Sequence, residues 1–230
     1  MPGLFCEEDC VKRMCALVAV LFAVVASASA QEKPADPDRW EPAIQKFEAE
    51  DKANPPVRDG IVFIGASSIV RWNLAESFPD LKAVNRGFGG SEMADSARYA
   101  ARVVLPHAPR IVVLYPGEND LARGTTPAAI GAGFATFFDT VRTALPATRV
   151  VAIGLKPTPA RWHLTAQMHE TNTLIRSYCA SHTRCVYVDV WPAMLGADGK
   201  PKPEHFIADG QHMTPAGYTV WTGLVRPHLK

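Results

Sequence analysis

The length and charge of the chain exclude several classes of protein before any motif is considered. Its 230 residues, 47% of them hydrophobic and 20% charged, fit one ordinary globular domain, so a second full domain is not expected. Lys and Arg number 24 against 23 Asp and Glu, which leaves no excess of positive charge for binding phosphates. We therefore expect no nucleic-acid partner.

The first 30 residues have the pattern of an export signal. A continuously apolar run, Ala16–Val25, follows two basic residues, and small residues precede an expected cleavage after Ala30. The run is shorter than the roughly 20 residues of a bilayer-spanning helix, so no membrane span is expected in the mature chain. We predict that residues 1–30 are a signal peptide and that the mature protein is periplasmic or secreted. Either Met1 or Met14 could be the true start.

Residues 31–56 form an N-terminal extension. The polar, proline-containing stretch up to Asp38 predicts a disordered lead into the fold. Trp40, Ile44 and Phe47 then recur at helical spacing. We expect an amphipathic helix here that packs on the outside of the core.

Residues 57–230 predict an α/β domain. Five short strand candidates alternate with segments of helix length: Ile61–Ile64, Ala83–Asn85, Ile111–Leu114, Val150–Leu155 and Val186–Val190. Because parallel strands need crossover connections and bury both faces, this alternation predicts a five-stranded parallel sheet in a three-layer α/β/α sandwich. The expected helices are Ala94–Val104, Pro127–Leu145, Leu164–Ser181 and Pro215–His228, the last capped by Thr214.

The first predicted strand runs directly into Gly65-Ala66-Ser67-Ser68. A hydroxyl is thus presented at the carboxyl end of a parallel strand, where ligands of such sheets bind. A serine pair in this position is also a common helix cap, and the second glycine of a G-x-S-x-G elbow is absent. Ser67 is the candidate nucleophile, and Ser68 is an alternative because only the register of the turn separates the two.

Hydrogen-bond donors follow the second and third predicted strands. Glycines at 87, 89 and 90 indicate backbone that approaches another group closely or adopts a positive φ, so that the N–H of Gly90 could face an oxyanion. Asn119, in Pro116–Asp120, could donate an amide N–H to a developing negative charge. Both segments could instead be simple turns. No dinucleotide or phosphate-loop pattern is present.

Near the C-terminus, Asp209 precedes His212 by three residues. Gly210 would let this loop fold back, so that Asp209 holds the Nδ1–H of the imidazole and leaves Nε2 free as a general base. A surface turn is the alternative interpretation. A metal site is not expected, because the remaining histidines form no ligand spacing such as H-E-x-x-H.

Together these segments supply the nucleophile, base, orienting acid and donors that acyl transfer needs. Their order, Gly65-Ala66-Ser67, then Gly90, Asn119 and Asp209-x-x-His212, resembles the four blocks of the SGNH hydrolase (GDSL-like lipase/acylhydrolase) family. The resemblance runs from Ile61 to the C-terminus and is greatest to platelet-activating-factor acetylhydrolase-like bacterial esterases. In this chain Ala66 stands where the family usually has an acidic residue.

The resemblance implies a flavodoxin-like fold and a catalytic triad of Ser67, His212 and Asp209, without any cofactor. It also implies an oxyanion hole made of the Ser67 and Gly90 N–H groups and the Asn119 side chain. We expect a serine-dependent esterase that cleaves a short-chain ester, such as an acetyl ester, of a glycan or small molecule. The alternative is a catalytically inactive carbohydrate-binding or scaffold protein on the same fold.

Two further segments each leave two interpretations. Cys179 and Cys185 remain after removal of the signal, in a compartment that permits oxidation, so they form either a disulfide or two buried thiols. The segment Lys156–Trp162 follows the fourth predicted strand and either lines the pocket or forms a proline-stiffened surface loop.

Overall fold

The computed structural model describes residues 38–56 and 58–230. The predicted signal peptide and nearly all of the predicted disordered lead lie outside the described residues. Within the described residues, none of the helices combines the length and the apolar character needed to span a bilayer.

The centre of the fold is a five-stranded sheet in which all neighbouring strands are parallel, in the order β2-β1-β3-β4-β5. The strands are β1 (Ile61–Gly65), β2 (Ala83–Gly87), β3 (Ile111–Tyr115), β4 (Arg149–Ile153) and β5 (Cys185–Val188). This is the strand order of flavodoxin-like folds. The predicted five-stranded parallel sheet is therefore confirmed.

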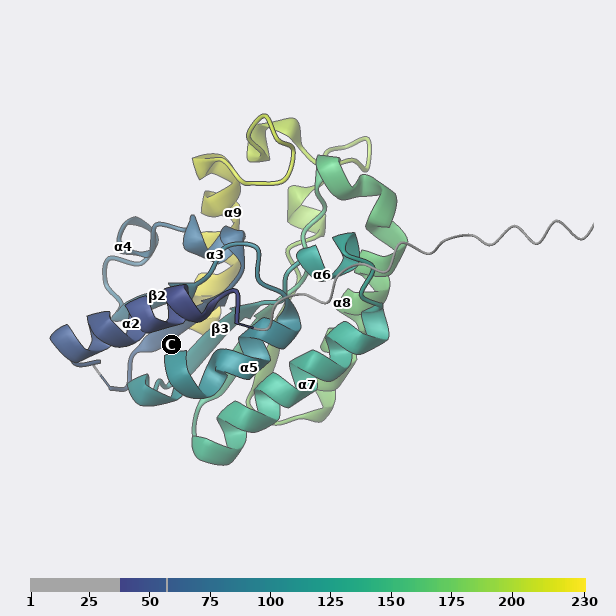
Figure 1. The fold of residues 1–230 in the computed structure, drawn as a ribbon. Coiled ribbons are helices and arrows are strands. Elements are labelled where there is room, and N and C mark those ends of the chain that lie inside the picture. The colour runs from purple at the N-terminus through teal and green to yellow at the C-terminus, as the bar shows by residue number, and fades with distance from the viewer. Residues whose placement is uncertain (1–37, 57) are drawn as a thin grey trace, which may run out of the picture. The chain divides into compact units, whose positions relative to one another are not determined.

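Helices cover both faces of this sheet, which gives the predicted three layers (Figure 1). The α-helices are α2 (Glu41–Ala53), α3 (Ser67–Val70), α4 (Leu74–Ser77), α5 (Met93–Val103), α6 (Asn119–Ala122), α7 (Pro127–Ala144), α8 (Thr165–Ser181) and α9 (Pro215–Val225). On one face α5 packs against α7, α7 against α8, and α2 against α5. On the other face Trp221 of α9 contacts Tyr115 of β3, with ring centroids 4.9 Å apart. Every residue of β1 and β3 is buried, as their continuous apolar sequences require.

The ends of the elements follow local chemistry. Thr214 caps α9 by accepting the N–H of Gly217 at 3.3 Å, as predicted. The α-helix ends at Val225 rather than His228, and a short 3₁₀ turn follows, because Pro227 has no N–H to continue the ladder. β4 ends two residues before its predicted end, since the N–H of Leu155 bonds to the Asn172 side chain at 2.7 Å and not to a neighbouring strand.

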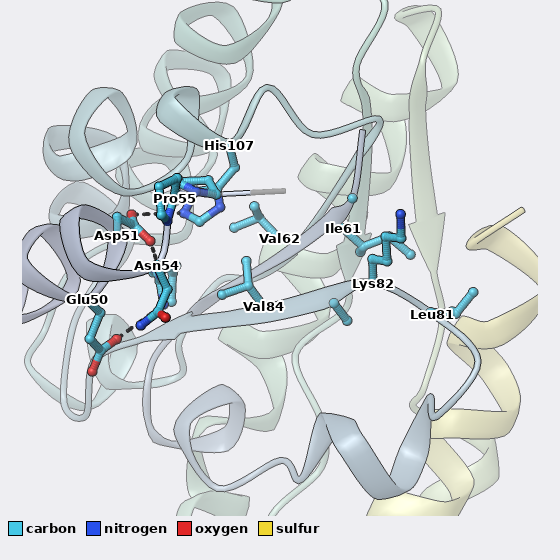
Figure 2. Close-up of a pocket in the computed structure, with 14 residues that line it drawn as sticks. Glu50, Asp51, Asn54, Pro55, Ile61, Val62, Leu81, Lys82, Val84 and His107 are labelled. Atoms are coloured by element: carbon cyan, nitrogen blue, oxygen red, sulfur yellow. Dashed lines mark hydrogen bonds and ion pairs between the residues drawn. The ribbon is translucent and has the colours of Figure 1, made fainter. Parts of the chain in front are cut away.

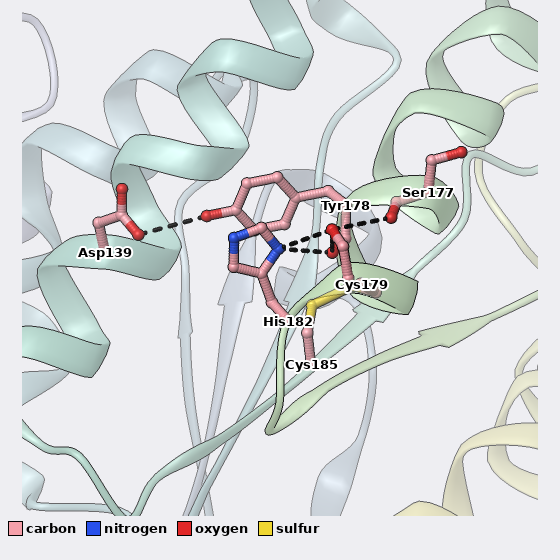
Figure 3. The surroundings of a disulfide bond; sticks show 7 residues. Asp139, Ser177, Tyr178, Cys179, His182 and Cys185 are labelled. Atoms are coloured by element: carbon pink, nitrogen blue, oxygen red, sulfur yellow. Dashed lines mark hydrogen bonds between the residues drawn. A yellow bond between two sulfur atoms is a disulfide. The ribbon is translucent and has the colours of Figure 1, made fainter.

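The two remaining cysteines are joined. Cys179, near the end of α8, is bonded to Cys185 at the start of β5, with their Cα atoms 4.6 Å apart. The stacked rings of Tyr178 and His182 lie beside this bond, and the Tyr178 hydroxyl donates to Asp139 of α7 at 3.2 Å (Figure 3). The disulfide interpretation is thus confirmed, and the bond ties the last turn of α8 to the strand that follows.

Candidate active site

The register of the sheet brings the candidate loops to one edge. Gly65, Gly87 and Tyr115 lie side by side at the carboxyl ends of β1, β2 and β3. The loops that follow these strands lie close together. A Cβ atom at Gly117, in the loop after β3, would lie 3.2 Å from the Ser91 carbonyl oxygen and 3.5 Å from the Ala66 side chain. The segments that follow these three strands therefore converge, as the parallel arrangement predicts.

A continuous line of hydrogen bonds joins Ser67, His212 and Asp209. The Ser67 Oγ atom lies 2.9 Å from Nε2 of His212, and Nδ1 of the same ring lies 2.6 Å from Oδ2 of Asp209. A neutral imidazole with its hydrogen on Nδ1 fits both contacts, since it donates to the carboxylate and leaves Nε2 to accept from the hydroxyl. The three side chains have the mutual geometry of a nucleophile, a base and an orienting acid.

The loop that carries Asp209 is folded to hold both its carboxylate and the imidazole. Gly210 has a φ of +64°, and Oδ1 of Asp209 accepts the backbone N–H groups of Gln211 at 2.8 Å and His212 at 2.9 Å. Partial burial raises the pKa of Asp209, but the hydrogen bonds from the His212 side chain and from these two N–H groups outweigh it, so the pKa lies well below its usual range. Asp209 is therefore a carboxylate at neutral pH.

The two adjacent serines face different surroundings. Ser67 begins α3 and faces His212, whereas Ser68 is buried and its Oγ accepts a hydrogen bond from Lys156 Nζ at 3.1 Å. The turn therefore directs Ser67 to the imidazole and Ser68 into the interior.

The candidate oxyanion donors follow β2 and β3 at the same edge of the sheet. Gly90 has a φ of +81°, which fits the expectation from the glycine-rich segment. Asn119 is almost completely buried at the start of α6, and its Nδ2 donates to the Ser91 carbonyl at 3.1 Å. An amide nitrogen carries two hydrogens, so Asn119 keeps a second N–H for a ligand.

A buried polar cluster under the nucleophile turn was not predicted. Lys156 Nζ donates to Glu118 at 2.6 Å and to the Tyr115 hydroxyl at 3.4 Å, and its side chain is fully buried. Burial lowers the pKa of Lys156, and Glu118 opposes that shift. Nearby, Arg161 Nη2 donates to Oδ1 of Asn119 at 3.0 Å. The segment Lys156–Trp162 thus contacts the candidate site through Lys156 at its start and Arg161 near its end, although Pro159 and Ala160 between them are exposed.

A cavity of about 590 Å³ lies elsewhere, at the opposite edge of the sheet (Figure 2). It is lined by the first residues of β1 and β2, with Asp51 and His107 paired at 3.1 Å to one side. Burial lowers the pKa of His107, and Asp51 opposes that shift. None of the described residues that line this cavity carries a hydroxyl or thiol side chain. Across residues 38–56 and 58–230, no three His, Cys, Asp or Glu side chains gather as metal ligands would.

The class of protein follows from comparison with known families. Residues 64–220 match the model of the GDSL-like Lipase/Acylhydrolase family. The chain belongs to this family and is a carboxylic ester hydrolase. The family resemblance inferred from the sequence is therefore confirmed.

Individual proteins are similar to this chain in sequence or in fold. The chain is 29% identical over 187 residues to human platelet-activating factor acetylhydrolase IB subunit alpha1, covering 79% of this chain and 78% of the relative. Its fold is similar to that of a GDSL-like lipase from Bacteroides thetaiotaomicron (TM-score 0.69, 20% identity, 81% of this chain and 96% of that chain). It is also similar to that of an acetylxylan esterase from Geobacillus stearothermophilus (TM-score 0.60, 15% identity, 74% and 94%).

Proposed function

We propose that this protein is a serine-dependent esterase that removes a short acyl group, such as acetyl, through an acyl-enzyme intermediate. The observation that carries the proposal is the hydrogen-bonded line from Ser67 through His212 to Asp209, at the carboxyl edge of the sheet. Ser67 is the proposed nucleophile, His212 its general base, and Asp209 the group that orients the imidazole.

In the first step Nε2 of His212 takes the Ser67 proton while Oγ attacks the ester carbonyl carbon. The tetrahedral oxyanion accepts hydrogen bonds from the N–H groups of Ser67 and Gly90 and from the Asn119 amide. On collapse the C–O bond to the alcohol breaks, and His212 returns the proton to the leaving alkoxide. In the second step His212 deprotonates water, which attacks the acyl-enzyme and releases the acid and free Ser67.

A short acyl group on a glycan or small alcohol is the proposed substrate class. The human relative is named an acetylhydrolase, and the Geobacillus structure is an acetylxylan esterase. Hydrolysis of p-nitrophenyl esters of graded chain length by the purified mature protein tests this proposal. We expect kcat/KM to be highest for acetate and to fall by at least tenfold by the octanoate. A maximum at long chains would contradict the assignment.

The alternative is a catalytically inactive carbohydrate-binding or scaffold protein. The unbroken line of hydrogen bonds to Ser67 favours the enzyme, because a scaffold has no need of a base held against a hydroxyl. A fluorophosphonate probe decides between them, since it reacts only with an activated serine. Covalent labelling supports the esterase, and absence of labelling supports the scaffold.

We propose further that the protein is exported, with cleavage after Ala30. The support is the apolar run and the small residues that precede this position. When the full chain is expressed in a bacterium and the periplasm is released, N-terminal sequencing should read from Gln31. A retained N-terminus in the cytoplasmic fraction would contradict export.

A further inference from the structure

Arg161 binds the amide oxygen of Asn119, the proposed oxyanion donor, whereas the amide nitrogen of Asn119 binds a backbone carbonyl. Its Nη2 donates to Oδ1 of Asn119 at 3.0 Å, while Nδ2 of Asn119 donates to Ser91 O at 3.1 Å. A guanidinium can only donate and a carbonyl oxygen can only accept. Both partners therefore fix the same orientation of the amide, which determines where its second N–H points.

Arg161 shares its neighbouring carboxylate with Lys156. Its Nη1 lies 3.8 Å from Glu118 Oε1, whereas Lys156 binds the same oxygen at 2.6 Å. Nη1 is buried and, among the described residues, has no hydrogen-bond partner. Lys156 and Arg161 thus share the Glu118 carboxylate, and the Asp209 carboxylate also acts electrostatically on Lys156. Arg161 is thus held beside Asn119 by the bond from Nη2 to Oδ1 and by the longer contact of Nη1 with Glu118.

The backbone also connects Arg161 to the other half of the site. The N–H of Ala160 donates to the carbonyl of Gly210 at 3.1 Å. Gly210 lies between Asp209 and His212. The segment that carries Arg161 is thus bonded to the acid–base loop, while its side chain reaches the oxyanion donor.

We propose that Arg161 is a positioning residue for acyl transfer that acts through Asn119. It holds the amide with its free N–H toward the oxyanion and polarises that amide with its own charge. Because the oxyanion exists only in the transition state and intermediate, this contribution appears in kcat more than in KM. The inference rests on the proposed function of Asn119.

A double-mutant cycle on p-nitrophenyl acetate tests this role with Arg161→Met, Asn119→Ala and the double variant. Arg161→Met should lower kcat by about 10- to 50-fold and change KM by less than about threefold. In the Asn119→Ala background the same change should lower kcat by less than about threefold, because its target is gone. Arg161→Lys, which keeps the charge but loses the planar fork, should recover part of the loss. Arg176→Met, which removes an exposed arginine paired with Asp189, is the control and should leave kcat unchanged.

Two results would overturn the inference: a kcat for Arg161→Met within twofold of wild type, or an equal loss with and without Asn119. If circular dichroism shows that Arg161→Met does not fold, Arg161→Lys takes its place in the cycle. The loss of kcat that Arg161→Lys causes is then compared with and without Asn119. The rate of fluorophosphonate labelling gives the same comparison without an ester substrate. A wild-type protein that neither hydrolyses esters nor takes the label would refute the proposed function and this inference with it, whereas an active wild type with a neutral Arg161→Met refutes the inference alone.

Discussion

The Ser67 hydroxyl and the His212 imidazole are hydrogen-bonded at 2.9 Å although 145 positions separate them in the chain. A second contact holds this arrangement, because the Tyr218 hydroxyl of α9 donates to the carbonyl of Ser68 at 2.9 Å. The loop of His212 leads directly into α9, so one helix is anchored to the turn that carries the nucleophile. The alignment of hydroxyl and base therefore depends on the packing of α9 as well as on the two side chains.

Ser67 and Ser68 can be distinguished by substitution. Ser67→Ala should lower kcat by about 10⁴- to 10⁶-fold, because it removes the hydroxyl that is bonded to His212. Ser68→Ala should keep fluorophosphonate labelling and cost about 1 kcal/mol of stability, because Lys156 loses one of its hydrogen-bond partners. Intact-mass measurement after exposure to the fluorophosphonate shows whether each variant is labelled. Labelled Ser67→Ala protein would contradict the assignment.

Asp209→Asn should lower kcat by about 10³-fold with little change in fold. The new amide nitrogen, or the reoriented side chain, no longer stabilises the hydrogen on Nδ1 of His212, so the tautomer that leaves Nε2 as base is disfavoured. Asp198→Asn is a matched control, because Asp198 also accepts a backbone N–H two residues ahead, from Lys200, in an exposed turn. In steady-state kinetics, the kcat of Asp209→Asn should therefore be about 10³-fold lower than that of Asp198→Asn. Equal activities would show that Asp209 does not orient the base.

The sequence was sufficient for the sheet and for the residues that converge at its edge. Polar residues after β1, β2 and β3 must meet, because parallel strands in register end at the same level, and this holds whatever the loops do. The choice between Ser67 and Ser68 could not be made in this way. It depends on the register of one turn, in which Ser68 is bound by Lys156 from the loop after β4, 88 positions away.

The cluster around Arg161 and Glu118 could not be predicted for a related reason. Neither residue has a local pattern that distinguishes a buried charge from a solvated one, and Lys156–Trp162 was equally compatible with a surface loop. Burial there results from how the loop after β4 packs on the loop after β3, and it is seen in the bonds from Lys156 to Glu118 and from Arg161 to Asn119.

Removal of the disulfide should destabilise the protein moderately without affecting the chemistry. The bond closes a loop with a sequence separation of six between Cys179 and Cys185, for which the chain-entropy model gives about 2 kcal/mol. The Cys179→Ala/Cys185→Ala variant should therefore unfold at lower urea concentration with unchanged kcat. Protein recovered from the periplasm should be about 2 Da lighter than its reduced form. A fully reduced periplasmic product would contradict the bond.

Asp120 should make stability depend on pH. The pKa of Asp120 is raised to about 7, because burial and the charge of Glu92 raise it by more than the N–H of Met93, which donates to Oδ1 at 2.9 Å, lowers it. Oδ2 is also buried and lacks a hydrogen-bond partner within the described part of the chain. Between about pH 4, the ordinary value for an unfolded Asp, and pH 7, the folded state binds more protons than the unfolded state. The free energy of unfolding therefore falls as the pH rises through this interval, and this loss is complete above pH 7.

Asp120→Asn should remove that dependence, because the amide keeps an oxygen for the Met93 N–H and carries no charge at any pH. The difference in unfolding free energy, variant minus wild type, should grow by up to about 4 kcal/mol between pH 4 and pH 7 and then stay constant. Urea denaturation at half-unit pH steps measures this difference, in which the titration of all other groups cancels. Asp198→Asn, at an exposed position, should give a curve parallel to wild type. If the curve of Asp120→Asn were equally parallel, Asp120 would titrate alike in the folded and unfolded chain, and its burial would have no effect on its ionisation.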